Sequence, residues 1–260
     1  MMIGYACDET KQLMPMPVVL ANRIVRELSA CRQSSYIQGI LPDGKAQVTV
    51  EYENGKPVRL DSVVVSCQHK EEKDLKKLEA EIRKKVLLPA LRPLPPDEET
   101  KIYINPSGRF VCGGLDADTG LTGRKLMVDS YGSMVPHGGG AFAGKDCSKV
   151  DRSAAYMARY IAKNIVAAGL ASKCQVSLAY AIGVAQPVMV QVDTFGTGNV
   201  CADDCLELAI PLVFGLTPKQ IVDTCALPVL FSDRQLPSGI SGEKSFRGSI
   251  PIRQKLFAMR

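Results

Sequence analysis

The chain has 260 residues, of which 46% are hydrophobic and 23% are charged, and its formal net charge is +5. This balance is typical of a globular protein and excludes a disordered tail, a collagen-like rod and a mucin-like stalk. The charge is mild, so we expect no nucleic-acid partner. No run of about 18 uninterrupted apolar residues occurs, so we expect no transmembrane helix and no membrane partner. The first twelve residues lack the pattern of a secretory signal.

The cysteines indicate a reducing compartment. There are nine of them, an odd number, and no C-x-x-C motif occurs. With only two histidines, His69 and His137, the chain offers no zinc-site spacing. We therefore expect free thiols and a cytoplasmic location.

Four elements are predicted in the first third of the chain. Residues 17–32 have a helical pattern. Residues 45–52 and 63–66 alternate around Asn54-Gly55, which is a strong hairpin signal. In residues 71–86 apolar side chains recur every three or four positions, which predicts an amphipathic helix with a charged outer face.

A proline-rich stretch follows and is predicted to be a connecting loop. Residues 89–97 can form neither a helix interior nor a central strand, because proline lacks an N–H donor. Beyond it, residues 102–104 and 110–112 are expected to be short strand pieces on either side of a turn at 105–108.

The same order of elements recurs in the second half. A helix over 151–168 is followed by strands over 173–180 and 188–193 and by a helix over 202–213. The repeated helix–strand–strand–helix order predicts a structural duplication. It indicates an α+β fold with mixed, largely antiparallel sheets and helices on one face.

Glycines and cations are interleaved between residues 113 and 151. Such a segment suits a polyphosphate, although the glycines are equally compatible with structural turns. Residues 139–145 fit G-x-x-x-x-G-K, but Asp146 stands where a P-loop needs Ser or Thr. The expected capping signal, Ser148 with Asp151, comes several residues after the lysine. We therefore exclude a P-loop.

Two aspartates near this segment each have two interpretations. Asp151 is favoured by the dipole of the helix that it begins, and it is also a candidate magnesium ligand. Asp118 precedes a glycine and is either a turn former or an acceptor for an amine or ribose hydroxyl. The residue pattern does not decide between the two interpretations of either aspartate.

No nucleophilic triad is predicted. His137 lies in a glycine-rich loop, and His69 is expected at the head of the charged helix. Cys147 lies closest to the basic loop, but no histidine is paired with it, so we expect no catalytic thiol.

Several motifs make the sequence resemble the S-adenosylmethionine synthetase (methionine adenosyltransferase) family. The resemblance runs from residue 2 to about residue 215, with Ala143 where the family typically has serine. The motifs that carry it are residues 2–6, 104–110, 120–125, 138–146, 148–155 and 180–183.

The resemblance implies a fold and a reaction. The family joins ATP and L-methionine into S-adenosylmethionine, displacing triphosphate and then hydrolysing it, with Mg²⁺ and K⁺. Its fold has three similar α/β subdomains around a pseudo-threefold axis. This chain is expected to hold two of them, a central-type domain over 1–112 and a C-terminal-type domain over 113–260. A homodimer or homotetramer with sites between subunits is implied.

Site residues are carried over by matching motif positions. The resemblance implies that Lys145, Arg124 and Lys125 are catalytic, that Asp118 and Lys149 contact methionine, and that Asp151 holds a metal ion. The positions implied to contact ATP are Asp43, Gly44, Lys45, Arg109, Phe110, Asp118, Arg124, Lys125, Ala141, Lys145 and Ile182.

Two departures from the family pattern change the expectation for this chain. The family's N-terminal domain, with a histidine and acidic metal ligands, has no counterpart before Met2. The match also weakens from about Leu227, and residues 237–260 lack the family's Tyr-Gly-His-Phe pattern. We therefore expect little synthesis by this chain alone. The alternatives are a non-catalytic ATP-binding or regulatory subunit that assembles with a complete synthetase, and a fragment without function.

Overall fold

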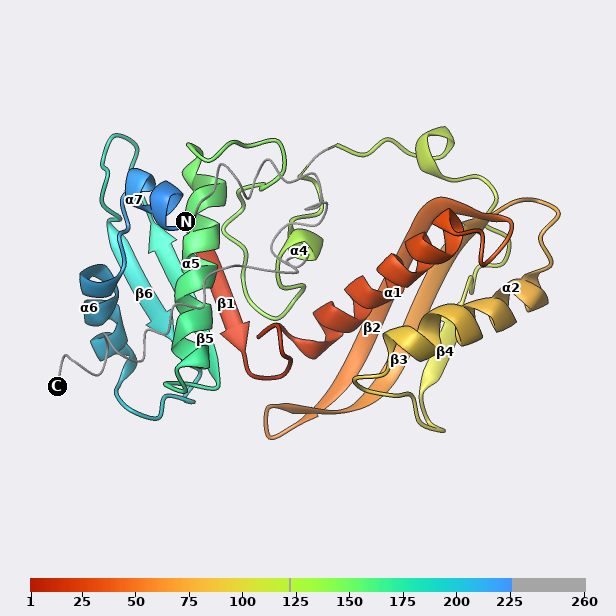
Figure 1. The fold of residues 1–260 in the computed structure, drawn as a ribbon, viewed down its shortest axis with the longest axis horizontal. Helices are drawn as coiled ribbons and strands as arrows, with labels where there is room; N and C mark the ends of the chain where they lie inside the picture. Colours follow the sequence, from red (N-terminus) through yellow and green to blue (C-terminus); the bar gives the residue numbers. More distant parts are fainter. Residues whose placement is uncertain (122, 226–260) are drawn as a thin grey trace. The chain divides into compact units, whose positions relative to one another are not determined.

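The structure is a computed structural model that describes residues 1–121 and 123–225 (Figure 1). The chain divides into two compact units. Met16–Gly120 forms one, which we call the contiguous unit. Met1–Pro15 and Leu121–Arg260 form the other, the two-segment unit. The weakened match from Leu227 lies outside the described residues.

The contiguous unit has a helical layer on a three-stranded sheet (Figure 1). Its main elements are α1 (Met16–Gln33), β2 (Ile40–Glu53), β3 (Lys56–His69), α2 (Leu75–Ile82) and β4 (Lys101–Ile104). The strand order is β2-β3-β4, with an antiparallel β2–β3 pair and a parallel β3–β4 pair. The sheet is therefore mixed, as predicted.

The Asn54-Gly55 hairpin is confirmed. Both residues have positive φ, 49° and 75°, the backbone that a tight two-residue hairpin turn requires. The strands on either side are each 14 residues long, well beyond the expected 45–52 and 63–66. The alternation of side chains in the sequence identified the centres of the two strands. Main-chain pairing between β2 and β3 extends beyond those centres.

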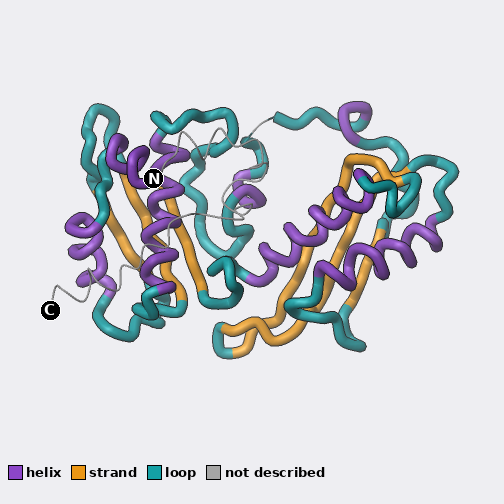
Figure 2. Tube along the Cα trace, viewed as in Figure 1, coloured by secondary structure: helices purple, strands orange, loops and turns teal. Residues whose placement is uncertain are grey.

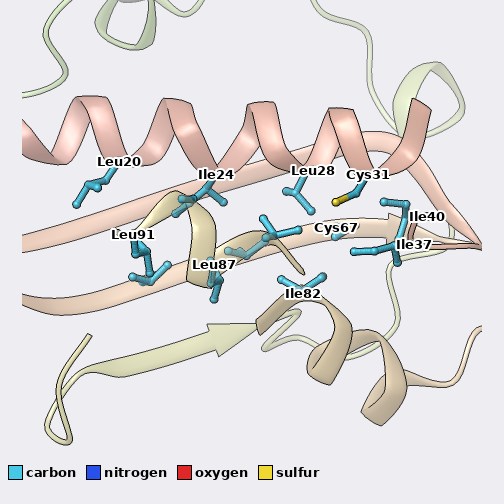
Figure 3. Packing of buried hydrophobic residues seen from close by; sticks show 14 of the residues in the cluster. Leu20, Ile24, Leu28, Cys31, Ile37, Ile40, Cys67, Ile82, Leu87 and Leu91 are labelled. Atoms are coloured by element: carbon cyan, nitrogen blue, oxygen red, sulfur yellow. The ribbon is translucent and has the colours of Figure 1, made fainter. Parts of the chain in front are cut away.

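The core of the contiguous unit lies between the helices and one face of the sheet (Figure 3). From α1, Leu20, Ile24 and Leu28 point into it at four-residue spacing. Burying each such side chain stabilises the fold by about 1.5–3 kcal/mol. The other fully or nearly fully buried members include Ile37, Leu60, Val63, Val65, Leu78, Ile82, Val86, Leu87 and Leu91.

The predicted 71–86 helix is shifted toward the C-terminus. It begins at Leu75 because the Asp74 side chain accepts a 2.7 Å hydrogen bond from the Lys77 N–H and caps the first turn. It continues past Val86 through a π-helical turn (η1, Arg83–Leu87) and α3 (Leu88–Ala90).

Pro89 therefore lies inside helical backbone, and the expectation of a loop from residue 89 was wrong at its start. Pro89 has no N–H for the Lys85 carbonyl four residues earlier. The Leu88 N–H bonds to the Arg83 carbonyl in the wider π pattern, and the freed Lys85 carbonyl lies 4.0 Å from the Cys31 thiol. The π turn accommodates the proline.

The two-segment unit has a second three-stranded sheet, in the order β1-β5-β6, with both pairs antiparallel. Helix α5 packs on it closely, because a Cβ on Gly4 would lie only 2.0 Å from the Ala158 carbonyl carbon. The elements of the two-segment unit are β1 (Met2–Cys7), α4 (Leu126–Asp129), α5 (Val150–Ala167), β5 (Lys173–Ala179), β6 (Met189–Asp193), α6 (Asp203–Val213) and α7 (Pro218–Thr224).

The helix–strand–strand–helix order occurs in both units, as α1-β2-β3-α2 and as α5-β5-β6-α6. The predicted recurrence of this element order and the α+β class are confirmed. The strand piece expected at 110–112 was wrong. Both main-chain groups of Phe110 instead bond to His69, so this stretch forms a loop fastened to the end of β3.

The nine cysteines are all free thiols, as expected. Burial raises the pKa of the Cys7 and Cys174 thiols to about 12 and that of Cys67 to about 11. These three thiols are core residues that stay protonated at neutral pH.

Within the described residues, no single helix is long and apolar enough to cross a membrane. Helices α6 and α7 pass that test only when taken together, by length and composition, and they are bent by 82° at the break between them.

Candidate functional site

The two-segment unit places two basic loop segments side by side. A Cβ on Gly123 would lie 2.4 Å from the Ala141 Cβ, so Gly123 and the glycine-rich loop are in contact there. Arg124 and Lys125 follow Gly123 and are both exposed. Residues 130–149 contain neither helix nor strand (Figure 2), and loops of this kind often carry binding residues.

Among the described residues of this unit, Lys145 and Asp151 form the shortest ion pair. The Lys145 Nζ lies 2.5 Å from Asp151 Oδ2, and both side chains are partly exposed. The Arg152 guanidinium donates to the Lys145 carbonyl at 2.9 Å. The first turn of α5 therefore fixes both the side chain and the main chain of Lys145.

The expected capping signal at Ser148 was wrong. Helix α5 begins at Val150, its N-cap is Lys149, and no side chain caps it. The Ser148 hydroxyl and N–H instead bond to the Asp146 carboxylate at 2.5 and 2.8 Å, and these bonds lower the pKa of Asp146. Lys149 remains exposed at the helix start.

Two glycines of the 138–140 run are needed for close packing. A Cβ on Gly138 would lie 1.9 Å from the Met1 carbonyl oxygen, and one on Gly140 would lie 2.8 Å from Asp151 Cγ. These contacts set the loop against the start of β1 and against α5. The structural interpretation of these two glycines therefore has direct support.

In the contiguous unit, residues 43–45 lie in the exposed first part of β2. Two contacts hold Asp43. Its N–H donates to Gln68 Oε1 at 3.3 Å, and its Oδ2 accepts from the Gly114 N–H at 2.9 Å. Lys45 is exposed two residues further on.

The loop after β4 holds Arg109 and Phe110. The Arg109 guanidinium donates to the Glu71 carbonyl at 2.5 Å. The Phe110 N–H donates to His69 Nε2 at 3.1 Å, and its carbonyl accepts from the His69 N–H at 2.9 Å.

The expected position of His69 was wrong. It is the last residue of β3, it is fully buried, and it does not head the charged helix. Gln68 beside it is buried too, with its side chain bonded to residues 43 and 111. Sequence reasoning missed both as site residues, although a polar Gln-His pair ending an apolar strand is a signal that could have singled them out.

Asp118 and Ile182 are both highly exposed. Asp118 accepts a 2.8 Å hydrogen bond from the Thr119 N–H, which fits its interpretation as a turn former. Ile182 is fully exposed beside Gly183. Gly114 links Asp118 to Asp43, because its carbonyl accepts from the Asp118 N–H at 3.0 Å and its N–H donates to Asp43 Oδ2. No described contact brings Ile182 to the other candidate positions of its unit.

Histidine His137 stabilises its own loop. Its Nδ1 accepts from the Gly139 N–H at 2.8 Å, and its ring packs against Phe142 with centroids 5.7 Å apart. Burial lowers its pKa, and the nearby Asp129 carboxylate opposes that shift. These contacts give His137 a structural role.

Among residues 1–121 and 123–225, no three His, Cys, Asp or Glu side chains gather as a metal-binding group. Asp151 would therefore offer one carboxylate, and phosphate oxygens would complete the coordination. Mg²⁺ is commonly held in this way, by one or two carboxylates together with substrate phosphates. The donor chemistry at Asp151 fits that ion.

The sequence-derived site residues fall into two groups, one in each unit. Both groups contain exposed cations, which suit a polyanion. In the two-segment unit they are Arg124, Lys125, Ala141, Lys145, Lys149, Asp151 and Ile182; in the contiguous unit they are Asp43, Gly44, Lys45, Arg109, Phe110 and Asp118.

Comparison with known proteins defines the class. Residues 1–110 match the family model of the S-adenosylmethionine synthetase central domain, and residues 112–246 match that of its C-terminal domain. The chain belongs to the S-adenosylmethionine synthetase family. It is 55% identical over 223 residues to the S-adenosylmethionine synthase of Myxococcus xanthus (strain DK1622), an alignment that covers 86% of this chain and 56% of that protein. The chain thus spans about half the length of this curated relative.

Proposed function

We propose that this chain binds ATP through its triphosphate and takes part in the synthesis of S-adenosylmethionine from ATP and L-methionine. One observation carries the proposal. Lys145 and Asp151 lie in direct contact beside the glycine-rich loop, at family motif positions, so a phosphate-binding cation and a metal-binding carboxylate adjoin each other.

The proposed chemistry is a displacement. The methionine sulfur attacks the 5′ carbon of ATP, a C–S bond forms, and the C–O bond to triphosphate breaks with its electron pair leaving on oxygen. Lys145, Arg124 and Lys125 bind the triphosphate and neutralise the charge that develops on it. No general base is needed, because the thioether sulfur carries no proton. Hydrolysis of the triphosphate follows.

The remaining roles follow the family positions. By those positions, the ATP contacts are Asp43, Gly44, Lys45, Arg109, Phe110 and Ala141. Ile182 packs on adenine. Asp118 and Lys149 hold methionine, and Asp118 also contacts the adenosine.

We propose Mg²⁺ and K⁺ as the cofactors. Asp151 would hold Mg²⁺, which would supply further neutralisation of phosphate charge. Before the metal and ATP bind, the Lys145 ammonium balances the Asp151 carboxylate.

We propose a homodimer or homotetramer with sites between subunits, located in the cytoplasm and without nucleic-acid or membrane partners. The nine free thiols support a reducing compartment. The mixed charge along the chain supports the absence of a nucleic-acid partner.

The test combines binding and turnover on the 260-residue chain. Calorimetry with ATP and with inorganic tripolyphosphate, both with Mg²⁺, is expected to show binding of each. Incubation with ATP, methionine, Mg²⁺ and K⁺, followed by mass spectrometry, measures S-adenosylmethionine. Binding without turnover is the result expected of the non-catalytic subunit. If neither ATP nor tripolyphosphate binds, the proposed site is refuted.

A further inference from the structure

The last three residues of β3 are all buried and all bond to the loop after β4. Cys67 pairs through its main chain with the Asn105 side chain, at 2.7 and 3.0 Å. Gln68 donates from Nε2 to the Val111 carbonyl at 3.0 Å. His69 bonds to both main-chain groups of Phe110. This strand end therefore fixes the loop at successive points.

The contacts of His69 assign its tautomer. The Phe110 N–H can only donate, so Nε2 is the acceptor. Nδ1 then donates to the Lys70 carbonyl at 2.8 Å. Both ring nitrogens are used, in a site with no exposed surface.

Gln68 connects the two segments of the contiguous unit that we propose to contact ATP. Its Oε1 accepts from the Asp43 N–H, while its Nε2 holds the Val111 carbonyl next to Phe110. A Cβ on Gly113 would lie 2.8 Å from Gln68 Cδ and 2.9 Å from the Phe110 ring. Gly113 is extended, with φ −163°, so close approach, and not backbone conformation, favours glycine there.

We propose that Gln68 and His69 are positioning residues, which hold the Asp43 and Phe110 segments at a fixed spacing for ATP. This inference rests on the proposed function. His69 orients Phe110 through the Phe110 N–H, and Gln68 fixes the distance from that loop to β2. Neither side chain needs to touch the nucleotide, since both are buried beneath the segments that they hold.

Three variants of the 260-residue chain separate the two hydrogen bonds of His69. His69→Gln keeps an acceptor for the Phe110 N–H. His69→Asn keeps a donor for the Lys70 carbonyl but does not reach Phe110. His69→Leu keeps neither. We expect ATP affinity near the original value in His69→Gln and about tenfold weaker in the Asn and Leu variants, a ratio that corresponds to about 1.4 kcal/mol.

Inorganic tripolyphosphate is the second probe, with both ligands measured by calorimetry in the presence of Mg²⁺. It has no base or ribose for Phe110 to contact, so its affinity should stay within about threefold in all three variants. If His69 only stabilised the fold, its variants would bind ATP and tripolyphosphate more weakly to the same extent. Alternatively, ATP affinity would follow the thermal stability of each variant and would not differ between His69→Gln and His69→Asn. Either of those results, or unchanged ATP affinity in His69→Leu, overturns the inference. If the original chain binds neither ligand, the proposed function fails, and the inference fails with it.

Discussion

Lys145 is held from two sides by the first turn of α5, through its ammonium and through its own carbonyl. Replacing Lys145 with Ala removes a charge-assisted contact of roughly 1.5–3 kcal/mol. Tripolyphosphate should then bind roughly 10- to 150-fold more weakly in calorimetry, and Arg124→Ala should act in the same direction. Lys219→Ala is the matched control, because Lys219 is an exposed lysine of the same unit, paired with Asp223. Unchanged affinity in both site variants, with the fold intact, would remove these residues from the site.

Asp97 shows how one exposed carboxylate responds to pH. The Arg59 guanidinium and the Thr100 hydroxyl hold the pKa of Asp97 well below its usual range. A carboxylate with a lowered folded-state pKa stabilises the fold at neutral pH, and that stabilisation is lost as the pH falls below about 4. Asp97→Asn should lower the melting temperature at pH 7, and the difference from the original chain should shrink progressively below pH 4.

The control for Asp97 is Glu98→Gln, which removes a neighbouring exposed carboxylate. Thermal unfolding of both variants between pH 7 and pH 3 provides the measurement. A difference between Asp97→Asn and the original chain that stays constant over this range would contradict the assigned shift.

At the scale of elements, α5 and β1 approach so closely that no side chain fits between them at Gly4. A Cβ there would collide with main-chain atoms of Ala158 and Arg159 at 2.0 and 2.1 Å, and main chain cannot rotate away. Gly4→Ala should lower the free energy of unfolding by about 3 kcal/mol, measured by denaturant titration. Gly120→Ala, where the added Cβ meets open space, should change it by less than about 0.5 kcal/mol. Equal effects would refute the packing argument.

The sequence predicted most elements of the repeat because their apolar residues recur with a clear period. Leu20, Ile24 and Leu28 identify α1 in this way, and Asn54-Gly55 identifies the hairpin. The π turn before Pro89 was not predictable from periodicity, because it depends on which carbonyl the proline leaves unbonded. The polar Gln68-His69 pair was a signal at the end of β3, but its partners were not predictable, since the Asp43 and Phe110 N–H groups that donate to it lie far away in the sequence.

The candidate site could be predicted only in part, for a similar reason. The family resemblance implied roles for Lys145 and Asp151, and the structure brings the two side chains into contact. Their pairing depends on the loop folding back onto the first turn of α5, which packing of Gly140 against Asp151 permits. The capping role expected for Ser148 failed because Asp146 is a nearer partner for the Ser148 hydroxyl.

At the scale of the whole molecule, we expect self-association through the sheet face of the contiguous unit that is turned away from its helices. Gln47, Val64 and Tyr103 are register partners across its three strands. They alternate with the core-facing Val63 and Val65, so they form a flat, partly polar row. We expect this row to pair with the same face of a second copy.

Sedimentation at micromolar concentration measures this association. Val64→Glu should shift the chain toward monomer, because it places a charge in the middle of the row. Leu88→Glu, at an exposed apolar position in the helical layer, should leave the association unchanged. A clean monomer for the original chain, or equal behaviour of both variants, would contradict the prediction.

The pairing of β1 with β5 has a consequence for how the protein is made. Met2 pairs with Leu178, so after synthesis β1 waits for about 170 further residues before its partner strand exists. At about 5–20 residues per second, that wait lasts roughly 8 to 35 s. The core of the contiguous unit draws only on residues 16–104 and is complete much earlier. During translation, the six residues of β1, all buried in the finished fold, remain an uncovered apolar segment that chaperones can bind and that can aggregate.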